Sequence, residues 1–242
     1  MACWLRCETG DAPACGACLD ALPGCFLPTE NALTAEMVQE LAIACPLLQR
    51  AACFVWCGVP EAAAVTTVLP GPLSLEIYTL DGDADYLIQL VEVLRGNAAL
   101  ASLDLSYNDI GDAGAAQLAE SLRVNGTLTS LELWETNIGD AGATQLAESL
   151  RVNATLTSLD LSCNRIGDAG AAQLAGSLRI NTALTSLDLS CNRIGDAGAA
   201  QLAESLRVNA ALRLLRTGTN SISDAGNRAL QAARPPQCVL YV

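Results

Sequence analysis

Histidine and lysine are absent from this chain of 242 residues, so all 13 of its basic residues are arginine. Without histidine, a Ser–His–Asp or Cys–His pair cannot form, and without lysine there is neither a Schiff base nor the lysine of a Walker loop. Aromatic residues are also scarce, at 4% of the chain. We therefore expect a protein that is not an enzyme, with no catalytic residues and no cofactor.

Positive charge is in short supply as well, because 26 acidic residues face 13 basic ones and give a formal net charge of -13. Such a surface repels nucleic acid and anionic membranes. The most apolar stretch, residues 51–75, is interrupted by prolines and glycines, and residues 1–10 lack the apolar core of a secretory signal. We expect a cytoplasmic monomer that binds neither nucleic acid nor membrane, and a protein partner with a basic surface.

A block that returns every 28 residues fills most of the chain from Leu100 onward. A fixed period of this length indicates a solenoid, in which each repeat buries its faces against its neighbours. In the first copy, the alternation of apolar and polar residues around Leu103 and Leu105 predicts a strand buried on one face. The following run, with Ala115 and Leu118 at helical spacing, predicts a helix.

Four polar or small positions in each copy have predicted structural roles. We expect Asn108, replaced by Thr136 in the second copy, to satisfy backbone groups of the bend after the strand. Asp112 and its equivalents are predicted to cap the first free amides of the helix that follows. Gly114 and its equivalents predict close packing of helix on strand. Asn125 and its equivalents are expected to end the helices in the left-handed conformation.

The pattern LxxLxLxxN followed by IGDAGAxxLAxSLRVN resembles the leucine-rich repeat of the ribonuclease-inhibitor-like subfamily, as in NOD-like receptors and Ran GTPase activators. The resemblance covers residues 73–232, with a weaker copy before Leu100. It implies an α/β leucine-rich-repeat solenoid, a horseshoe with parallel strands on the concave face and helices on the convex face. It also implies binding of a partner through the concave face. Residues 233–242 are predicted to add a C-terminal edge strand.

The N-terminal part departs from the repeat. Residues 33–72 are predicted to form an N-terminal cap or irregular leucine-rich repeats. Within them, residues 33–56 resemble the cysteine-containing leucine-rich repeat of F-box proteins, and residues 27–56 are similar to the F-box itself. Residues 1–32 form a cysteine-rich segment in which Cys15 and Cys18 make a single CxxC. Structural zinc sites usually contain two such pairs, so we predict no bound metal.

Outward-facing strand positions of successive repeats form columns on the concave face. Acidic residues about 4.8 Å apart in one column repel each other by about 1 kcal/mol per adjacent pair in water, which a cationic surface would relieve. The alternative is that these acids only keep a solvated face polar. The column reads Glu76, Asp104, Glu132, Asp160, Asp188 and then Arg216.

Aromatic residues and cysteines stand in the two columns beside the acids. Trp and Tyr at exposed positions dominate the energy of many interfaces, although chance divergence of an old copy is the alternative explanation. Cys163 and Cys191 occupy one column in adjacent strands, near enough for a disulfide or a thiol contact if the strands pair in register. The predicted partner-binding residues are Tyr78, Asp104, Tyr107, Glu132, Trp134, Glu135, Asp160 and Asp188.

Three functions follow from these observations. The first is a non-enzymatic scaffold that captures a protein partner through its concave face. The second is a substrate receptor of a ubiquitin ligase, in which residues 27–56 would dock the linker protein as an F-box does. The third, implied by the resemblance to Ran GTPase activators, is a regulator of a small GTPase.

Overall fold

The computed structural model describes residues 100–242 in full, together with residues 91, 94–96 and 98 and the backbone of residues 4–8, 52–56 and 73–76. Tyr78, the CxxC at Cys15 and Cys18, and most of the F-box-like segment lie outside the described residues. The predictions made for them and for the domain boundaries stay predictions.

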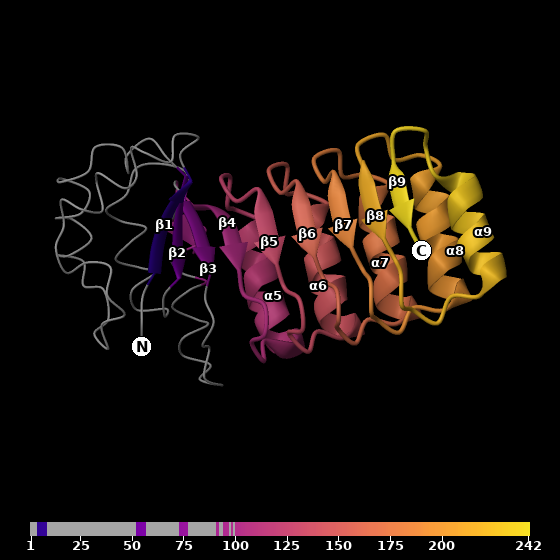
Figure 1. Cartoon of the computed structure of the whole chain (residues 1–242), viewed down its shortest axis with the longest axis horizontal. Coiled ribbons are helices and arrows are strands. Elements are labelled where there is room, and N and C mark those ends of the chain that lie inside the picture. The colour runs from indigo at the N-terminus through magenta and orange to yellow at the C-terminus, as the bar shows by residue number, and fades with distance from the viewer. Residues whose placement is uncertain are drawn as a thin grey trace, which may run out of the picture.

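One sheet runs through the described part of the chain, and its nine strands lie side by side in chain order (Figure 1). β1 (Trp4–Glu8) is antiparallel to β2 (Ala52–Trp56), and every later strand is parallel to the one before it. The order without crossovers is that of a solenoid. The other strands are β3 (Leu73–Glu76), β4 (Leu100–Asp104), β5 (Ser130–Glu132), β6 (Ser158–Asp160), β7 (Ser186–Asp188), β8 (Leu214–Arg216) and β9 (Val239–Tyr241).

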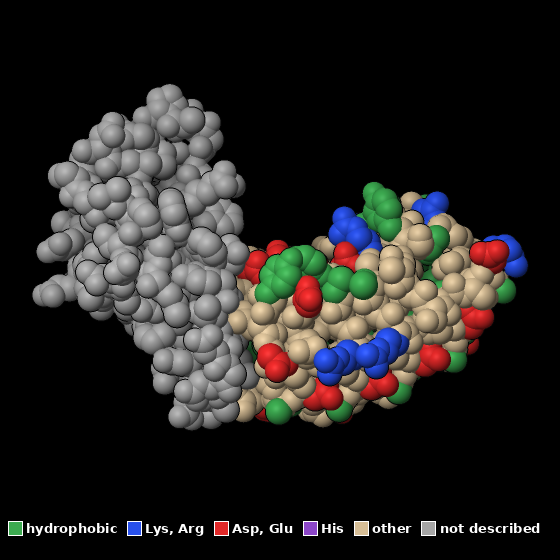
Figure 2. All heavy atoms as spheres, turned by 60° about the horizontal axis from the view of Figure 1, so that its bottom comes forward, with side chains coloured by type: hydrophobic (Ala, Val, Ile, Leu, Met, Phe, Trp, Pro, Cys, Tyr) green, Lys and Arg blue, Asp and Glu red, His purple; other side chains and the backbone are tan. Residues whose placement is uncertain are grey.

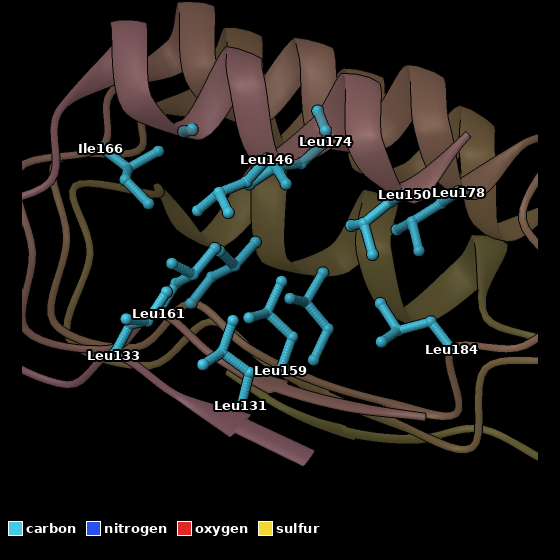
Figure 3. Close-up of a cluster of buried hydrophobic side chains, with 14 of the residues drawn as sticks. Leu131, Leu133, Leu146, Leu150, Leu159, Leu161, Ile166, Leu174, Leu178 and Leu184 are labelled. Carbon is cyan, nitrogen blue, oxygen red and sulfur yellow. The ribbon is translucent and has the colours of Figure 1, made fainter. Parts of the chain in front are cut away.

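The fully described helices all lie on one face of this sheet (Figures 1 and 3). Packed helices are about 8–10 Å apart whereas strands are about 4.8 Å apart, so the array curves with its strands on the concave side and its helices on the convex side. This confirms the predicted α/β leucine-rich-repeat solenoid. The helices are α5 (Gly111–Leu122), α6 (Asp140–Leu150), α7 (Asp168–Leu178), α8 (Asp196–Leu206) and α9 (Asp224–Ala233).

Leucines fill the space between the two layers. In the second repeat, Leu131 and Leu133 point from the strand side toward Leu146 and Leu150 of α6, and all four are at most 1% exposed (Figure 3). Burying a leucine side chain contributes about 1.5–3 kcal/mol, and the same positions are filled in the repeats on either side. The core is therefore one continuous layer rather than a set of separate clusters.

The asparagines that follow strands β6, β7 and β8 bind the bend, as predicted, and also tie it to the preceding repeat. Asn164 donates to the carbonyl oxygen of Leu161 at 3.1 Å in its own repeat and to that of Leu133 at 2.7 Å one repeat earlier. Its side-chain oxygen accepts a hydrogen bond of 2.9 Å from the backbone N–H of Ile138. The side chain is buried, so each bond replaces one that water would otherwise supply.

The prediction that Asp112 caps its own helix is wrong. Its Oδ1 accepts hydrogen bonds from the backbone N–H groups of Gly139 at 2.7 Å and Gly142 at 2.9 Å, which belong to the start of α6 in the next repeat. The same pair of bonds leads from Asp140 to α7 and from Asp168 to α8. Each of these carboxylates therefore caps the helix that follows its own.

The prediction that Asn125 and its equivalents adopt the left-handed conformation is also wrong, since none of the four has a positive φ. Asn153 instead donates to the carbonyl oxygen of Leu122, the last residue of α5, at 2.7 Å. Its side-chain oxygen accepts from the backbone N–H of Leu156 at 2.8 Å. A carbonyl that the end of a helix leaves unpaired is thus satisfied from the next repeat.

The recurring glycine marks a close approach of helix to helix, not of helix to strand as predicted. A Cβ added at Gly142 of α6 would lie 2.9 Å from the Cβ of Ala115 in α5 and 2.8 Å from Oδ1 of Asp112. It would also lie 3.0 Å from Cγ2 of Ile138, in the loop before the same helix. The glycine thus makes room for the neighbouring helix and for the carboxylate that caps it.

Candidate protein-interaction surface

The strand register places the acidic residues of successive repeats in one column. Each pairs with its counterpart in the next strand, and the column ends at Arg216 in β8. Glu132 is exposed, whereas Asp104, Asp160 and Asp188 are half-buried. Of Glu76 only the backbone is described, and it pairs with Asp104.

Three of these acids also have a local structural role that the sequence analysis missed. Oδ1 of Asp160 accepts hydrogen bonds from the backbone N–H and the hydroxyl of Ser162, at 2.7 and 2.6 Å. Asp104 and Asp188 accept from the backbone N–H two residues further on, at 2.9 Å in each case. The signal was present in the recurring Asp-Leu-Ser, because an aspartate two residues before a turn commonly binds the backbone in this way.

Charge along the column is uneven. Burial is the main cause that raises the pKa of Asp160 from its ordinary value, and the charge of Asp188 raises it further. At the far end Nη1 of Arg216 lies 3.3 Å from Oδ2 of Asp188, and its guanidinium carbon lies 5.4 Å from the ring centre of Tyr241. The negative potential of the described column is therefore partly neutralised at β8 and least so toward Asp104 and Glu132.

Two predicted aromatic residues meet at that more negative end. The rings of Tyr107 and Trp134 have centroids 4.4 Å apart at an interplanar angle of 64°, an edge-to-face arrangement. Tyr107 is 63% exposed, Trp134 is half-buried, and Glu135 beside it is exposed. Figure 2 shows hydrophobic side chains grouped next to acidic ones on this side of the molecule. Tyr107, Trp134 and Glu135 together are called the aromatic patch below.

The patch belongs to a rim where the strands end and the backbone turns into the left-handed region. The residues at this position have φ between 53° and 63°, although none is glycine or asparagine. The conformation costs about 1–2 kcal/mol for ordinary residues and is held here by bonds between repeats. For example, the N–H of Tyr107 donates to the carbonyl of Trp134 at 2.9 Å. The five residues of this strand-end rim are Tyr107, Glu135, Cys163, Cys191 and Thr219.

The second repeat has Thr136 where its neighbours have the asparagine that follows the strand, and this difference alters the loop just after Tyr107. Thr136 has no side-chain carbonyl, so the N–H of Ile110 bonds to the carbonyl of Asn108 at 3.0 Å instead. Gly111 then takes a φ of 60° and donates to the backbone oxygen of Thr136. Helix α5 consequently begins one position earlier than its counterparts, and the loop beside the aromatic patch differs from the later loops.

The described part of the chain contains no group of three or more Cys, Asp or Glu side chains arranged to hold a metal ion. None of the helices described there is long and apolar enough to cross a membrane. The prediction about zinc concerned the cysteine-rich segment, which lies outside the described residues.

Comparison with known proteins supports the fold. A family described as leucine-rich repeat matches residues 96–119, 124–147, 152–175 and 181–203. No curated protein matches the sequence significantly.

Among solved structures, the tropomodulin C-terminal domain of Caenorhabditis elegans is 16% identical with a TM-score of 0.51, over 61% of this chain and 90% of that one. The actin-binding site 2 of leiomodin-1 is 24% identical with a TM-score of 0.44, over 53% and 79%. At these identities the first likeness speaks for the fold alone, and the second carries no argument.

Proposed function

We propose that this chain, whose repeats match the leucine-rich repeat family, is a non-enzymatic scaffold that binds a protein partner through its concave face and strand-end rim. The observation that carries the proposal is the edge-to-face pair of the exposed Tyr107 and the half-buried Trp134. We also propose that the chain belongs to the ribonuclease-inhibitor-like subfamily, because of its 28-residue period and repeat pattern.

The aromatic patch has the composition of a binding hot spot. At the position of Trp134 the neighbouring repeats carry Ser106 and Ser162, and at the position of Tyr107 the later repeats carry glutamate, cysteine or threonine. The size of the two aromatic side chains is therefore not required by the repeat. A tyrosine and a tryptophan that are accessible at a surface lose apolar surface to a partner at small cost in side-chain entropy, and such residues commonly contribute about 2 kcal/mol or more to binding. Glu135 supplies a charge at the edge of the patch that fixes the orientation of a partner.

The acidic column extends the proposed surface and suits a partner with a basic face. Asp104, Glu132, Asp160 and Asp188 lie on the strands next to the patch, and the whole chain carries a net charge of -13. A complementary positive surface would be steered toward this face, and its association rate would fall as salt screens the charges. Tyr78, which lies outside the described residues, is proposed to extend the patch by one repeat.

We also propose that the scaffold is cytoplasmic and monomeric. Cys163, Cys191 and Cys238 are free thiols, which suits the reducing cytoplasm. We expect the unbound protein to be a monomer, because a net charge of this size opposes self-association. Sedimentation equilibrium measures this directly, and a dimer at micromolar concentration would contradict it.

Affinity capture from an extract of the native cells tests the function. The full chain, its Trp134→Ala variant and its Val152→Ala variant are compared as baits. Val152 is 61% exposed and lies just after the end of α6, away from the strands, so its replacement trims an exposed hydrophobic side chain without touching the patch. We expect the wild type and Val152→Ala to retain the same partner and Trp134→Ala to lose it.

The outcomes separate the hypotheses. If Trp134→Ala captures the partner as well as the wild type does, the patch is not the binding site. If both variants lose it, the capture reflects general hydrophobicity. Recovery of a ubiquitin-ligase linker protein, unaffected by Trp134→Ala, would support the F-box-like alternative instead. Equal urea midpoints of the three proteins confirm that a loss of capture is not a loss of folding.

A further inference from the structure

Two free cysteines lie next to each other on the strand-end rim. Cys163 follows strand β6 and Cys191 follows strand β7, and both are reduced. Cys191 is exposed and Cys163 is half-buried, so small molecules in solution can reach the pair. The third free cysteine in the described residues, Cys238, is buried in the last repeat.

The geometry brings the two thiols together. Strands β6 and β7 pair in register, and the N–H of Cys163 donates to the carbonyl of Ser190, the residue before Cys191, at 2.9 Å. The two α-carbons are therefore separated by about the strand spacing of 4.8 Å, within the range that a disulfide spans. The backbone is the same at both, with φ of 53° and 56°, so both side chains leave the rim in the same direction. The neighbouring thiol of Cys163 is the main cause that raises the pKa of the Cys191 thiol.

We propose that Cys163 and Cys191 form a dithiol modification site that closes to a disulfide between repeats by exchange with a low-molecular-weight disulfide such as glutathione disulfide. The thiolate of one cysteine attacks the small disulfide, forms a mixed disulfide and releases one glutathione thiolate. The other cysteine gives up its proton and attacks the protein-side sulfur, which releases the second glutathione. The two protein sulfurs lose two electrons and two protons, and the two glutathione sulfurs gain them.

The site is built for reversible rather than permanent linkage. In-register neighbours on parallel strands have nearly parallel Cα–Cβ bonds, so their β-carbons lie about a strand spacing apart, somewhat beyond the mean of about 3.8 Å in disulfides. Closing the bond must draw the two repeats slightly together, and strained, exposed disulfides are the more easily reduced ones. This inference depends on the thiol geometry and not on the proposed partner-binding function.

Peptide mapping of the full chain tests the site. The reduced protein is equilibrated in glutathione buffers of increasing oxidised fraction, quenched in acid, alkylated and digested with trypsin without reduction. Cleavage after arginine places Cys163 in peptide 152–165 and Cys191 in peptide 180–193, with peptide 166–179 between them. We expect these two cysteines to lose alkylation together and a linked species of the two peptides to appear, while Cys238 stays alkylated.

The single variants complete the test. In Cys191→Ser, peptide 152–165 should carry a glutathione adduct instead of a link, and Cys163→Ser should show the converse on peptide 180–193. The proposal is overturned if both peptides of the wild type stay alkylated across the series. Separate glutathione adducts on the two peptides of the wild type, or links from either peptide to other cysteines, would overturn it equally. Adding dithiothreitol to the oxidised wild type should restore full alkylation, and a failure to do so would contradict reversibility.

Discussion

The carboxylate of Asp140 accepts a hydrogen bond of 2.7 Å from the backbone N–H of Gly167, the residue just before helix α7. Asp140 is itself the first residue of α6, so the start of one helix is held by the start of the helix before it. At the other end, Asn181 donates at 2.6 Å to the carbonyl of Leu150, the last residue of α6. Both ends of a helix therefore depend on neighbouring repeats, which couples their stabilities.

Replacing Asp140 by alanine should lower the free energy of unfolding by about 1–2 kcal/mol, because the N–H groups of Gly167 and Gly170 lose their shared acceptor. Urea denaturation followed by circular dichroism measures the change.

Asp224→Ala is the matched control for this change. Asp224 occupies the same position in α9, the last described helix, so it has no later helix to cap. Both substitutions remove a charge from a first helical turn. The difference between their losses in the free energy of unfolding therefore measures what the hydrogen bonds from Asp140 to the next repeat contribute. Equal losses of stability would show that the bond between repeats contributes nothing.

Two glycines of the same helix α7 should respond to alanine in opposite directions. A Cβ at Gly170 would lie 2.7 Å from Oδ1 of Asp140 and 2.9 Å from Cγ2 of Ile166, whereas a Cβ at Gly176 would meet only the end of the flexible Arg151 side chain, at 3.3 Å. We expect Gly170→Ala to destabilise by about 1–3 kcal/mol through overpacking, and Gly176→Ala to stabilise by about 0.5–1 kcal/mol through helix propensity. Thermal and urea unfolding of both variants decide this. Stabilisation by Gly170→Ala would refute the close fit between helices.

Thr136→Asn should restore, in the second repeat, the asparagine that follows the strand in the neighbouring repeats. The new side-chain carbonyl would accept from the N–H of Ile110, as Asn164 does for Ile138, and Gly111 would no longer need its φ of 60°. We expect a gain of about 1 kcal/mol in the free energy of unfolding.

The Thr136→Val variant serves as the comparison, because it keeps the shape of threonine but loses the hydroxyl that donates to Leu133 at 2.7 Å. It should destabilise by about 1 kcal/mol, since the hydrogen bond of the hydroxyl is lost and no new hydrogen bond replaces it. A Thr136→Asn protein that is less stable than the wild type would mean that the missing side-chain acceptor at position 136 does not destabilise the loop after Tyr107.

The raised pKa of Asp160 should make the free energy of unfolding depend on pH. Folding raises its pKa above the ordinary 3.8, mainly because the carboxylate is half-buried, so its ionised form costs stability at neutral pH. That cost disappears as the pH falls below 3.8, where the group is protonated in both states. Asp160→Asn keeps an oxygen for the N–H of Ser162 and should be more stable than the wild type at pH 7. The difference should shrink as the pH falls in urea titrations, and a difference that grows in acid would contradict the sign.

The solenoid and the column of acids were predictable because both depend only on the 28-residue period and on alternation within it. Leu103 and Leu131 occupy the same buried position in successive strands, as their place in the repeat requires. Once strands stack in register, residues 28 apart in sequence become neighbours in space. Stacking in register brings Tyr107 close to Trp134 and Cys163 next to Cys191.

The errors came from applying local rules to each repeat by itself. Asp112 has the position of a cap for its own helix and Asn125 that of a left-handed helix end, yet both bind groups of a neighbouring repeat. The left-handed rim was missed because Tyr107 and Cys163 are not residue types that favour positive φ. Bonds between repeats outweigh the local preference there, and no local pattern reports them.

Residues 156–175 and 184–203 are identical, and the hydrogen bonds that join their repeats are the same from one junction to the next. Duplication or deletion of one whole unit therefore creates no new kind of junction, whereas an insertion of a single residue misaligns the partners on both sides. Each added unit would lengthen the inner surface by about one strand spacing, roughly 4.8 Å. The span of the surface can thus be matched to the size of what it holds in small, uniform steps, without redesign of the interior.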